Sequence, residues 1–393
     1  MDIQGLIIAL LTMGAASIVI MMACNSFEEA SGYLGRHVYK MPDGVRGATI
    51  DAIGSSMPEL FTTFFLLFYY TDLDGFSAGI ATCAGSAVFN AVIIPALCIL
   101  VVTMRGIQKN GSLIKLPHIN LKRSTIMRDA FFFLLAEVTL IVFLAKADVD
   151  WKMGAALVFV YALYAAYLGH ETHSHRKKAA ALPEPSTLDL RDSAESFTTK
   201  LIRLDYNGLL FDGQPFSPKR AWVVLILATA TVGGACHFLA GAVMDSAAAM
   251  NVAPYFAAII LGAAATSVPD TVISVKAAAS GDYDDAVSNA MGSNIFDICI
   301  ALGVPLLMFS LLNNGMSVSL SSGGDGAANV QDLRVALIAL TVLVVCVFLY
   351  DLGPGEREPG KIRVGKVKAF MLLSFYICWT GYIVLQGSGL LSA

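Results

Sequence analysis

Long apolar runs recur from one end of the chain to the other, and they constrain its fold more than any other feature. A membrane-spanning helix needs about 20 mostly apolar residues, because each adds about 1.5 Å across a hydrocarbon core of about 30 Å. Ten segments of the 393-residue chain meet this requirement. They cover residues 3–24, 45–70, 76–104, 129–146, 152–169, 220–245, 253–280, 285–312, 333–351 and 364–386. The runs predict an all-α membrane protein with ten transmembrane helices.

The composition agrees with a chain that lies mainly in a lipid bilayer. Hydrophobic residues make up 56% of the chain and charged residues 14%, whereas a soluble domain has about 45–50% and about 25%. These values exclude a soluble enzyme, a disordered chain and a nucleic-acid-binding protein. The first apolar run lacks a basic segment before it and is expected to be a retained helix rather than a cleaved signal peptide.

Basic residues predict how the chain is oriented in the membrane. In the ten-helix arrangement 23 of the 26 Lys and Arg residues fall on one side, and only Lys146, Lys152 and Arg334 fall on the other. The side rich in basic residues faces the cytoplasm, which places both termini outside. We expect the polar stretch 170–219 to form a cytoplasmic loop. The short loops favour a plasma membrane, with an organellar membrane as the alternative.

The two halves of the sequence repeat each other. GSSMPE at 54–59 matches ATSVPD at 265–270, and GSAVFN at 85–90 matches GSNIFD at 292–297. Five spans per half is an odd number, so the second copy must be inverted in the membrane. Residues 1–169 and 220–393 are therefore expected to be two inverted five-helix repeats with broken helices at the midplane. This arrangement is typical of secondary transporters, whose sites lie at the midplane.

Acidic residues stand inside the apolar spans, at Glu59, Asp270 and Asp297. Each buried charge costs at least about 2.5–3.5 kcal/mol on insertion scales, so such residues normally face a cavity and bind something. Pro58 and Pro269 precede two of these acids, lack an amide hydrogen and clash with the carbonyl four residues back. We expect both helices to open there and to free carbonyl oxygens toward a cavity.

Hydroxyl and amide side chains accompany the acids. They are Ser55, Ser56, Ser86, Asn90, Thr266, Ser267 and Ser293. Calcium prefers six to eight oxygen ligands, and sodium, also a hard cation, should accept the same ligand types. No histidine or cysteine joins the set, which disfavours soft transition metals. The residues predict a site for transported hard cations and no resident cofactor.

The motif text is similar to that of a known superfamily. The segments GSSMPELFTT with GSAVFN, and TSVPDTVIS with AVSNAMGSNIFDICIALGVP, resemble the repeats of cation/calcium exchangers, particularly the potassium-dependent sodium/calcium exchangers. The resemblance implies that Glu59 and Asp270 are central calcium ligands and that Asn90 and Asp297 complete the middle of the site. It further implies two sodium sites, one from Ser55, Ser56 and Ser86 and its mirror from Thr266, Ser267 and Ser293, with backbone oxygens of Ala52 and Ala263.

Two acids do not follow the family pattern. Asp51 stands where the family usually has a small or apolar residue, and its repeat counterpart is Gly262. It is either a charge at the cytoplasmic entrance or a ligand. Glu137, alone in the fourth span, is either a structural group or part of an accessory site.

The leading functional prediction is a sodium/calcium antiporter that works by alternating access, with a calcium/proton antiporter as the alternative. An intramembrane enzyme is not favoured, because it would need a nucleophile–base pair or a zinc set. Residues 355–362 have the spacing of a P-loop but end in isoleucine instead of serine or threonine, so they do not predict a nucleotide-binding site. The acid at the position of Asp297 is tied to potassium co-transport in the resembling branch. Charge balance is compatible with transport with or without K⁺. Three ionised acids carry three negative charges, which Ca²⁺ and K⁺ together balance, whereas protonation of Asp297 leaves two negative charges, which Ca²⁺ alone balances. The oligomeric state stays open.

Overall fold

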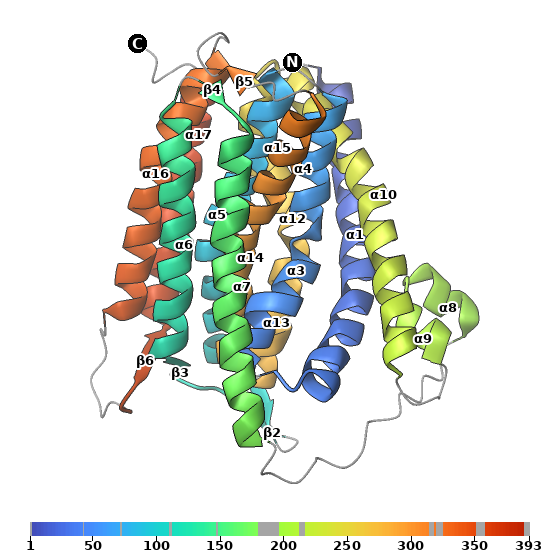
Figure 1. The fold of residues 1–393 in the computed structure, drawn as a ribbon, viewed down its shortest axis with the longest axis vertical. Helices are drawn as coiled ribbons and strands as arrows, with labels where there is room; N and C mark the ends of the chain where they lie inside the picture. The colour runs from blue at the N-terminus through green and yellow to red at the C-terminus, as the bar shows by residue number, and fades with distance from the viewer. Residues whose placement is uncertain are drawn as a thin grey trace.

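A computed structural model describes residues 2–41, 43–70, 73–109, 112–146, 148–179, 196–211, 217–313, 318–319, 325–350 and 358–388. Within these residues the chain is mostly helical, and the long helices run side by side along the long axis of the molecule (Figure 1). The unbroken long helices are α1 (Ile3–Tyr33), α5 (Leu73–Leu100), α6 (Arg123–Leu144), α7 (Trp151–Ala179), α10 (Pro218–Met250), α16 (Asp325–Leu349) and α17 (Lys366–Gly387). Helices α14 (Tyr283–Phe296) and α15 (Gly303–Leu312) flank a wide π-helical segment, η5 (Asp297–Leu302).

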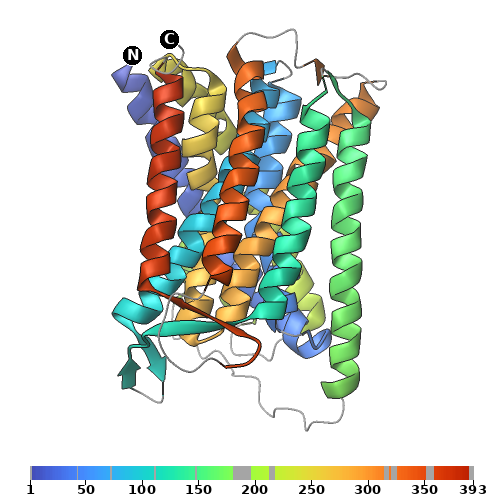
Figure 2. The same ribbon diagram turned by 90° about the vertical axis from the view of Figure 1, so that its left-hand side faces the viewer.

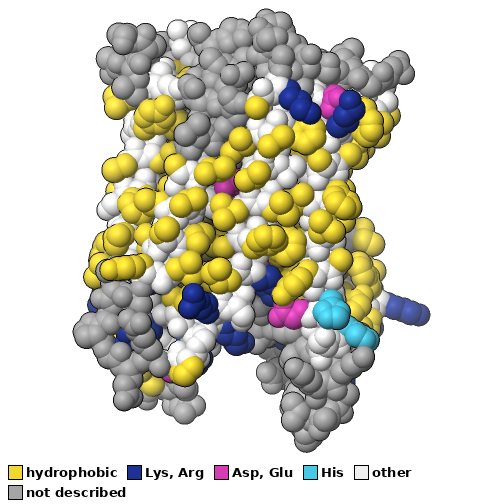
Figure 3. All heavy atoms as spheres, turned by 60° about the vertical axis from the view of Figure 1, so that its left-hand side comes forward, with side chains coloured by type: hydrophobic (Ala, Val, Ile, Leu, Met, Phe, Trp, Pro, Cys, Tyr) yellow, Lys and Arg dark blue, Asp and Glu magenta, His cyan; other side chains and the backbone are white. Residues whose placement is uncertain are grey.

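The lengths and polarity of these helices suit a bilayer. Among the described residues six continuous helical stretches are long and apolar enough to cross a membrane, and one bent pair adds a seventh span. Two shorter apolar helices, Met57–Tyr69 and Leu337–Leu349, accompany them. Hydrophobic side chains cover the middle of the face drawn in Figure 3, and its charged side chains gather mainly toward the two ends. The chain is therefore a helical membrane protein.

Two helices are broken at matching positions. The first consists of α2 (Asp43–Arg46), π turn η2 (Gly47–Asp51), α3 (Ala52–Ser55) and α4 (Met57–Tyr69). The second consists of α11 (Pro254–Ala257), π turn η4 (Ala258–Gly262), α12 (Ala263–Thr266) and α13 (Val268–Ser280). Each element lies 211 positions after its counterpart. The breaks at Ser56 and Ser267 directly precede the helices that carry a proline in their first turn, as the sequence predicts.

The carbonyls freed at the breaks are covered by α1. The Gly54 carbonyl accepts a hydrogen bond from Cys24 Sγ at 3.6 Å, and the Ala265 carbonyl accepts one from Ser17 Oγ at 3.1 Å. The expectation that these oxygens are left to line a cavity therefore needs correction. A buried carbonyl without a partner is costly, and α1 supplies the donors.

Helices α1 and α10, which open the two halves, pack along each other and are tied together near the end where the chain begins (Figure 1). The Asp2 amide donates to the Ala249 carbonyl at 2.8 Å. Helix α1 continues to Tyr33, beyond the apolar run that ends at residue 24, because its polar last turns keep their helical hydrogen bonds. The two helices thus form one unit, called here the α1–α10 pair.

A short helical hairpin braces the other end of this pair. It consists of α8 (Phe197–Ile202) and α9 (Tyr206–Phe211), which lie beside α10 in Figure 1. Asn207 Nδ2 donates to the Ser26 carbonyl of α1 at 2.8 Å, and the Tyr206 hydroxyl lies 2.7 Å from Thr231 Oγ1 of α10. The hairpin therefore contacts both members of the pair.

Short antiparallel strand pairs join the connections between helices. Strand β1 (Ile107–Lys109) pairs with β2 (Ser112–Ile114), and β4 (Asp148–Val149) pairs with β5 (Val318–Ser319). Strand β3 (His118–Lys122) lies beside β6 (Lys361–Gly365) in Figure 2. In this antiparallel pair His118 stands opposite Gly365. The last two pairs link connections of the first half to connections of the second.

Candidate cation site

The predicted site residues come together where the two broken helices meet α5 and α14. Glu59 lies in the first turn of α4, and Asp270 lies in the first turn of α13. Asn90 lies on α5, and Asp297 directly follows α14. All four side chains are fully buried. A cluster of buried carboxylates is stable only when positive charge or hydrogen bonds offset the cost of removing it from water.

The hydroxyl of Ser86 holds two of the acids together. Ser86 Oγ lies 2.9 Å from Glu59 Oε1, from Asp297 Oδ2 and from the hydroxyl of Ser267. A hydroxyl has one hydrogen to donate, so it cannot satisfy both carboxylates at once. The remaining negative charge calls for a proton or a cation at this point.

Asp270 is held by residues from both halves of the chain. Ser293 Oγ donates to Asp270 Oδ1 at 2.7 Å, and Asn90 Nδ2 donates to Asp270 Oδ2 at 3.0 Å. Asn90 Nδ2 also lies 3.3 Å from Ser86 Oγ, which connects this group to the Glu59 group. The two halves therefore build a single network.

Several buried oxygens in this network have no hydrogen-bond partner among the described residues. They are Ser56 Oγ, Glu59 Oε2, Asn90 Oδ1 and Asp297 Oδ1. Carboxylate, amide and hydroxyl oxygens are the ligand types that hard cations prefer. Among the described residues no three His, Cys, Asp or Glu side chains lie close enough together to hold a metal ion by themselves.

The remaining predicted residues occupy matching places in the two halves. The Ala52 carbonyl accepts from the Ser56 amide, and the Ala263 carbonyl accepts from the Ser267 amide, both at 3.0 Å. Hydroxyls of the same turns, from Ser55 and Thr266, contact these carbonyls at 3.4 and 3.1 Å. Each carbonyl therefore accepts from one amide and lies within reach of one hydroxyl, which together account for its two lone pairs.

Sequence reasoning missed two asparagines of α14. Asn289 Nδ2 donates to Ser274 Oγ at 2.9 Å, and its Oδ1 lies 3.4 Å from Ser55 Oγ. Asn294 is fully buried, and neither of its amide atoms has a partner among the described residues. Both lie in the motif AVSNAMGSN. Amide side chains inside an apolar span could have indicated them as candidate site residues.

The two acids outside the family pattern lie in different surroundings. Asp51 Oδ2 accepts a hydrogen bond from Arg46 Nη1 at 2.7 Å and so pairs with a buried arginine. Glu137 of α6 accepts one from Thr341 Oγ1 of α16 at 2.7 Å. Both acids are thus held by partners other than the residues around Ser86.

We expect Glu137→Gln to change thermal stability more than exchange. The amide oxygen keeps the Thr341 hydrogen bond while the charge is removed from a buried position. The measurement is the thermal unfolding temperature in detergent beside calcium uptake in proteoliposomes. A loss of uptake without a change in unfolding temperature would instead place Glu137 in the transport machinery.

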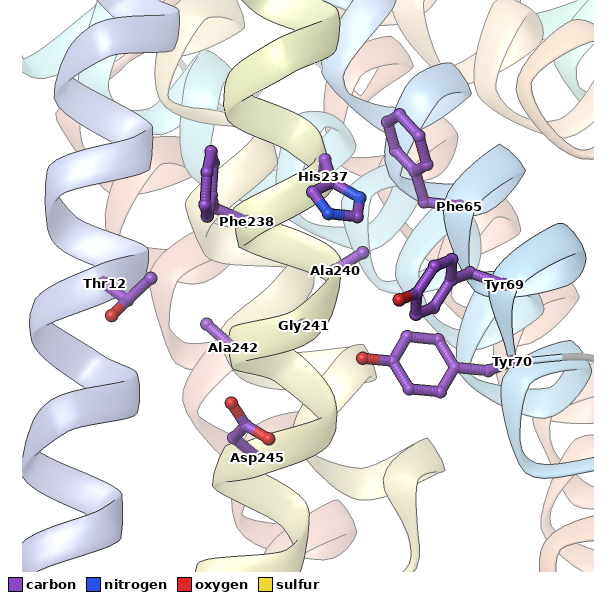
Figure 4. A pocket seen from close by; sticks show the side chains of 10 residues that line it. All are labelled: Thr12, Phe65, Tyr69, Tyr70, His237, Phe238, Ala240, Gly241, Ala242 and Asp245. Atoms are coloured by element: carbon purple, nitrogen blue, oxygen red, sulfur yellow. The ribbon is translucent and has the colours of Figure 1, made fainter.

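A separate hollow of about 250 Å³ opens between α1, α4 and α10 (Figure 4). The His237 ring lies 5.1 Å from the ring of Phe65 and 5.6 Å from that of Tyr69. Asp245 supplies a carboxylate to its lining. None of the three acids of the candidate site lines this hollow.

Comparisons with known proteins agree with this arrangement. Human sodium/potassium/calcium exchanger 5 is 23% identical over 88% of this chain and 77% of its own length. Human sodium/potassium/calcium exchanger 1 is 37% identical over 114 residues, which are 29% of this chain and only 9% of that protein. The chain thus spans a small part of the length of some curated relatives that it matches.

Solved structures share the fold. The sodium-calcium exchanger NCX_Mj, soaked with sodium and strontium, superimposes with a TM-score of 0.54 at 21% identity and covers 96% of this chain and 98% of its own. The H⁺/Ca²⁺ exchanger CAX superimposes with a TM-score of 0.53 at 12% identity and covers 98% of this chain and 88% of its own. The family model described as "Sodium/calcium exchanger protein" matches residues 8–169 and 220–385. The chain belongs to the sodium/calcium exchanger family, whose members are transporters and not enzymes.

Proposed function

We propose that the protein is a secondary antiporter that exchanges Na⁺ for Ca²⁺ at the buried cluster around Ser86. The observation that carries this proposal is the mirrored pair Glu59 and Asp270, each one turn after a helix break and joined through Ser86 and Asn90. Calcium and sodium are the substrates, the bilayer is the surrounding partner, and no resident cofactor takes part.

We also propose that the chain consists of two inverted five-helix repeats. The broken helices support this, because their elements recur at a constant spacing and α4 and α13 extend toward opposite ends of the bundle (Figure 1). In this arrangement residues 170–219 connect the repeats on the cytoplasmic side, and both termini face outward.

Charge balance makes the two cargoes compete. Glu59, Asp270 and Asp297 carry at most three negative charges, whereas one Ca²⁺ with three Na⁺ would bring five positive charges. Two like unit charges at about 4 Å repel by about 4 kcal/mol at an effective dielectric constant of 20. Bound Ca²⁺ therefore largely excludes Na⁺ from the site, and bound Na⁺ largely excludes Ca²⁺. Binding of either Ca²⁺ or Na⁺ neutralises the buried acids and permits the site to change the side of the membrane that it faces. An empty site keeps its uncompensated negative charge, which prevents this change.

The test is calcium uptake into proteoliposomes under a sodium gradient, a proton gradient or neither. Uptake driven by sodium supports the proposal. Uptake driven only by protons assigns the protein to the second candidate, a calcium/proton antiporter, which the fold of CAX and the carboxylates facing Ser86 favour. Uptake that dissipates without coupling to either gradient would contradict both and indicate a channel.

Removing the hydroxyls at the two breaks should alter sodium dependence. We expect Ser56→Ala and Ser267→Ala to raise the sodium concentration for half-maximal exchange about three- to tenfold while calcium binding persists, because each loses one oxygen ligand. Sodium activation curves in proteoliposomes measure this effect. Curves that match the unmodified protein would leave both hydroxyls with a packing role.

Potassium dependence should follow the charge of Asp297. An ionised Asp297 brings the cluster to three negative charges, which Ca²⁺ and K⁺ together balance. We therefore expect sodium-driven calcium uptake to fall when potassium is replaced by choline at clamped voltage, and Asp297→Asn to remove that requirement. Undiminished uptake in choline by the unmodified protein would rule out potassium co-transport.

A further inference from the structure

A buried arginine joins two carboxylates next to the candidate site, on the side where the long loop connects the halves. Arg46 lies at the end of α2, just before the π turn of the first broken helix. Its Nη1 donates to Asp51 Oδ2 at 2.7 Å, and its Nη2 pairs with Asp285 at the start of α14. The three side chains are at most 5% exposed. One guanidinium thus bridges the first broken helix to a helix of the second half.

The backbones at this contact are also tightly packed. A Cβ added at Gly47 would lie 2.6 Å from the Asp285 carbonyl oxygen, and one added at Gly292 would lie 2.7 Å from Ala48 Cα. Since neither neighbour is the far end of a flexible side chain, the half-helix α2–η2–α3 is pressed against α14 along its length. The candidate site lies at the far end of this half-helix, where Ser55 contacts Ser293 at 3.4 Å. This seal therefore separates the site from the loop side of the membrane.

The opposite seal has the same backbone arrangement but no charge at the matching positions. There η4 and α12 pack on α5, and a Cβ added at Gly85 would collide with the Ile259 carbonyl oxygen. The sequence counterparts of Arg46, Asp51 and Asp285 are Ala257, Gly262 and Ala78. The two seals of one pseudo-symmetric molecule thus differ in an ion-pair triad that only the loop side has.

We propose that the Arg46–Asp51–Asp285 triad is a charged latch that keeps the loop-side seal closed and biases the protein away from the state open on that side. The inference rests on the proposed alternating-access function. Opening separates α2 from α14, so the guanidinium must leave at least one carboxylate. Each carboxylate that the guanidinium leaves loses this compensation, and taking the partner away from a buried charge is strongly destabilising. The opposite seal has uncharged residues at the three matching positions and has no such requirement.

Removing only the arginine should open the loop side. Arg46→Ala takes the guanidinium away from two buried carboxylates, and water entering the seal offsets this loss. An apolar copy of the opposite seal, Arg46→Ala with Asp51→Gly and Asp285→Ala, should instead stay closed, because replacing a buried ion-pair network by apolar residues is often neutral or stabilising. Arg46→Lys should fall between the unmodified protein and Arg46→Ala, since an ammonium is a point charge without the planar fork.

The test measures maleimide labelling of a cysteine placed at each seal, with peptide mass spectrometry separating it from the native cysteines. Val45→Cys reports the loop side and Ile259→Cys the opposite side, because both residues are fully buried. We expect Arg46→Ala to raise labelling at position 45 about tenfold, within the range of typical coupling energies, and to leave position 259 unchanged or lower. The apolar triple variant should label at position 45 no faster than the unmodified protein.

Unchanged labelling at position 45 in Arg46→Ala would overturn the latch, and so would an equal rise at both positions, which indicates general loosening. If Arg46→Ala does not fold, Arg46→Lys and the triple variant decide: slower labelling at position 45 in the triple variant than in Arg46→Lys supports the latch, and any other order contradicts it. Labelling requires no transport. If the protein shows no sodium-driven uptake, the proposed function is refuted. The labelling result still decides whether the triad keeps the loop-side seal closed.

Discussion

Replacing Glu59 by Gln, or Asp270 by Asn, should abolish calcium exchange while the protein still folds and inserts. Each change keeps the size of the side chain and an oxygen acceptor for Ser86 or Ser293, but it removes a charge that a divalent cation needs. We expect uptake to fall at least about 100-fold, equivalent to roughly 2.7 kcal/mol. The measurement is sodium-driven calcium uptake in proteoliposomes, normalised to the reconstituted protein.

The matched control is Glu137→Gln, which also neutralises a fully buried intramembrane carboxylate but at a position bonded to Thr341. It should retain most of its uptake. Near-normal exchange by either site variant would defeat the assignment of the site. A comparable loss in all three variants would show that neutralising any buried acid is harmful.

The second large effect is expected from the glycines at the two seals. Gly85→Ala places a Cβ against the Ile259 carbonyl oxygen, and Gly292→Ala places one 2.7 Å from Ala48 Cα. Because these neighbours are backbone atoms, the broken helices have to move outward. Their displacement carries the serines at the breaks away from the acids. We expect exchange to fall by about 100-fold and stability by about 1–3 kcal/mol, as for other overpacked contacts.

Uptake and thermal unfolding measured together check this expectation. The control is Gly381→Ala in α17, where an added Cβ meets nothing within 4 Å. This change should be neutral or slightly stabilising, since alanine is the better helix former. Full exchange by Gly85→Ala and Gly292→Ala would mean that the broken helices are not held by close backbone contact.

Most residues of the candidate site can be named from the sequence, because the physical reasons that single them out are local. A proline cannot continue the hydrogen bonding of a helix, so Pro58 and Pro269 are sufficient to indicate both breaks. An acid inside an apolar span has to be compensated, which identifies Glu59 and Asp270. The recurrence of the same motif in both halves then indicates that the two acids meet.

What the sequence does not reveal depends on contacts between distant segments. Nothing in the residues near Gly54 shows that Cys24 would cover its carbonyl, because the donor comes from another helix. The pairing of Arg46 with Asp285 is equally hidden, since Asp285 is far away in the sequence. The residues around Asn289 in the sequence likewise do not reveal its contact with Ser55. Such contacts follow from the packing of whole helices.

The α1–α10 pair has a mechanical consequence for the two repeats. One helix belongs to each half, and the pair is tied at one end by Asp2 with Ala249 and braced at the other by the α8–α9 hairpin. A body fastened at both ends cannot shear along its own seam, so a displacement of α1 displaces α10 equally. The two halves of the chain are therefore expected to move together through this pair. In the proposed antiporter this coupling would disfavour mixed intermediates, in which one half has changed its access and the other has not.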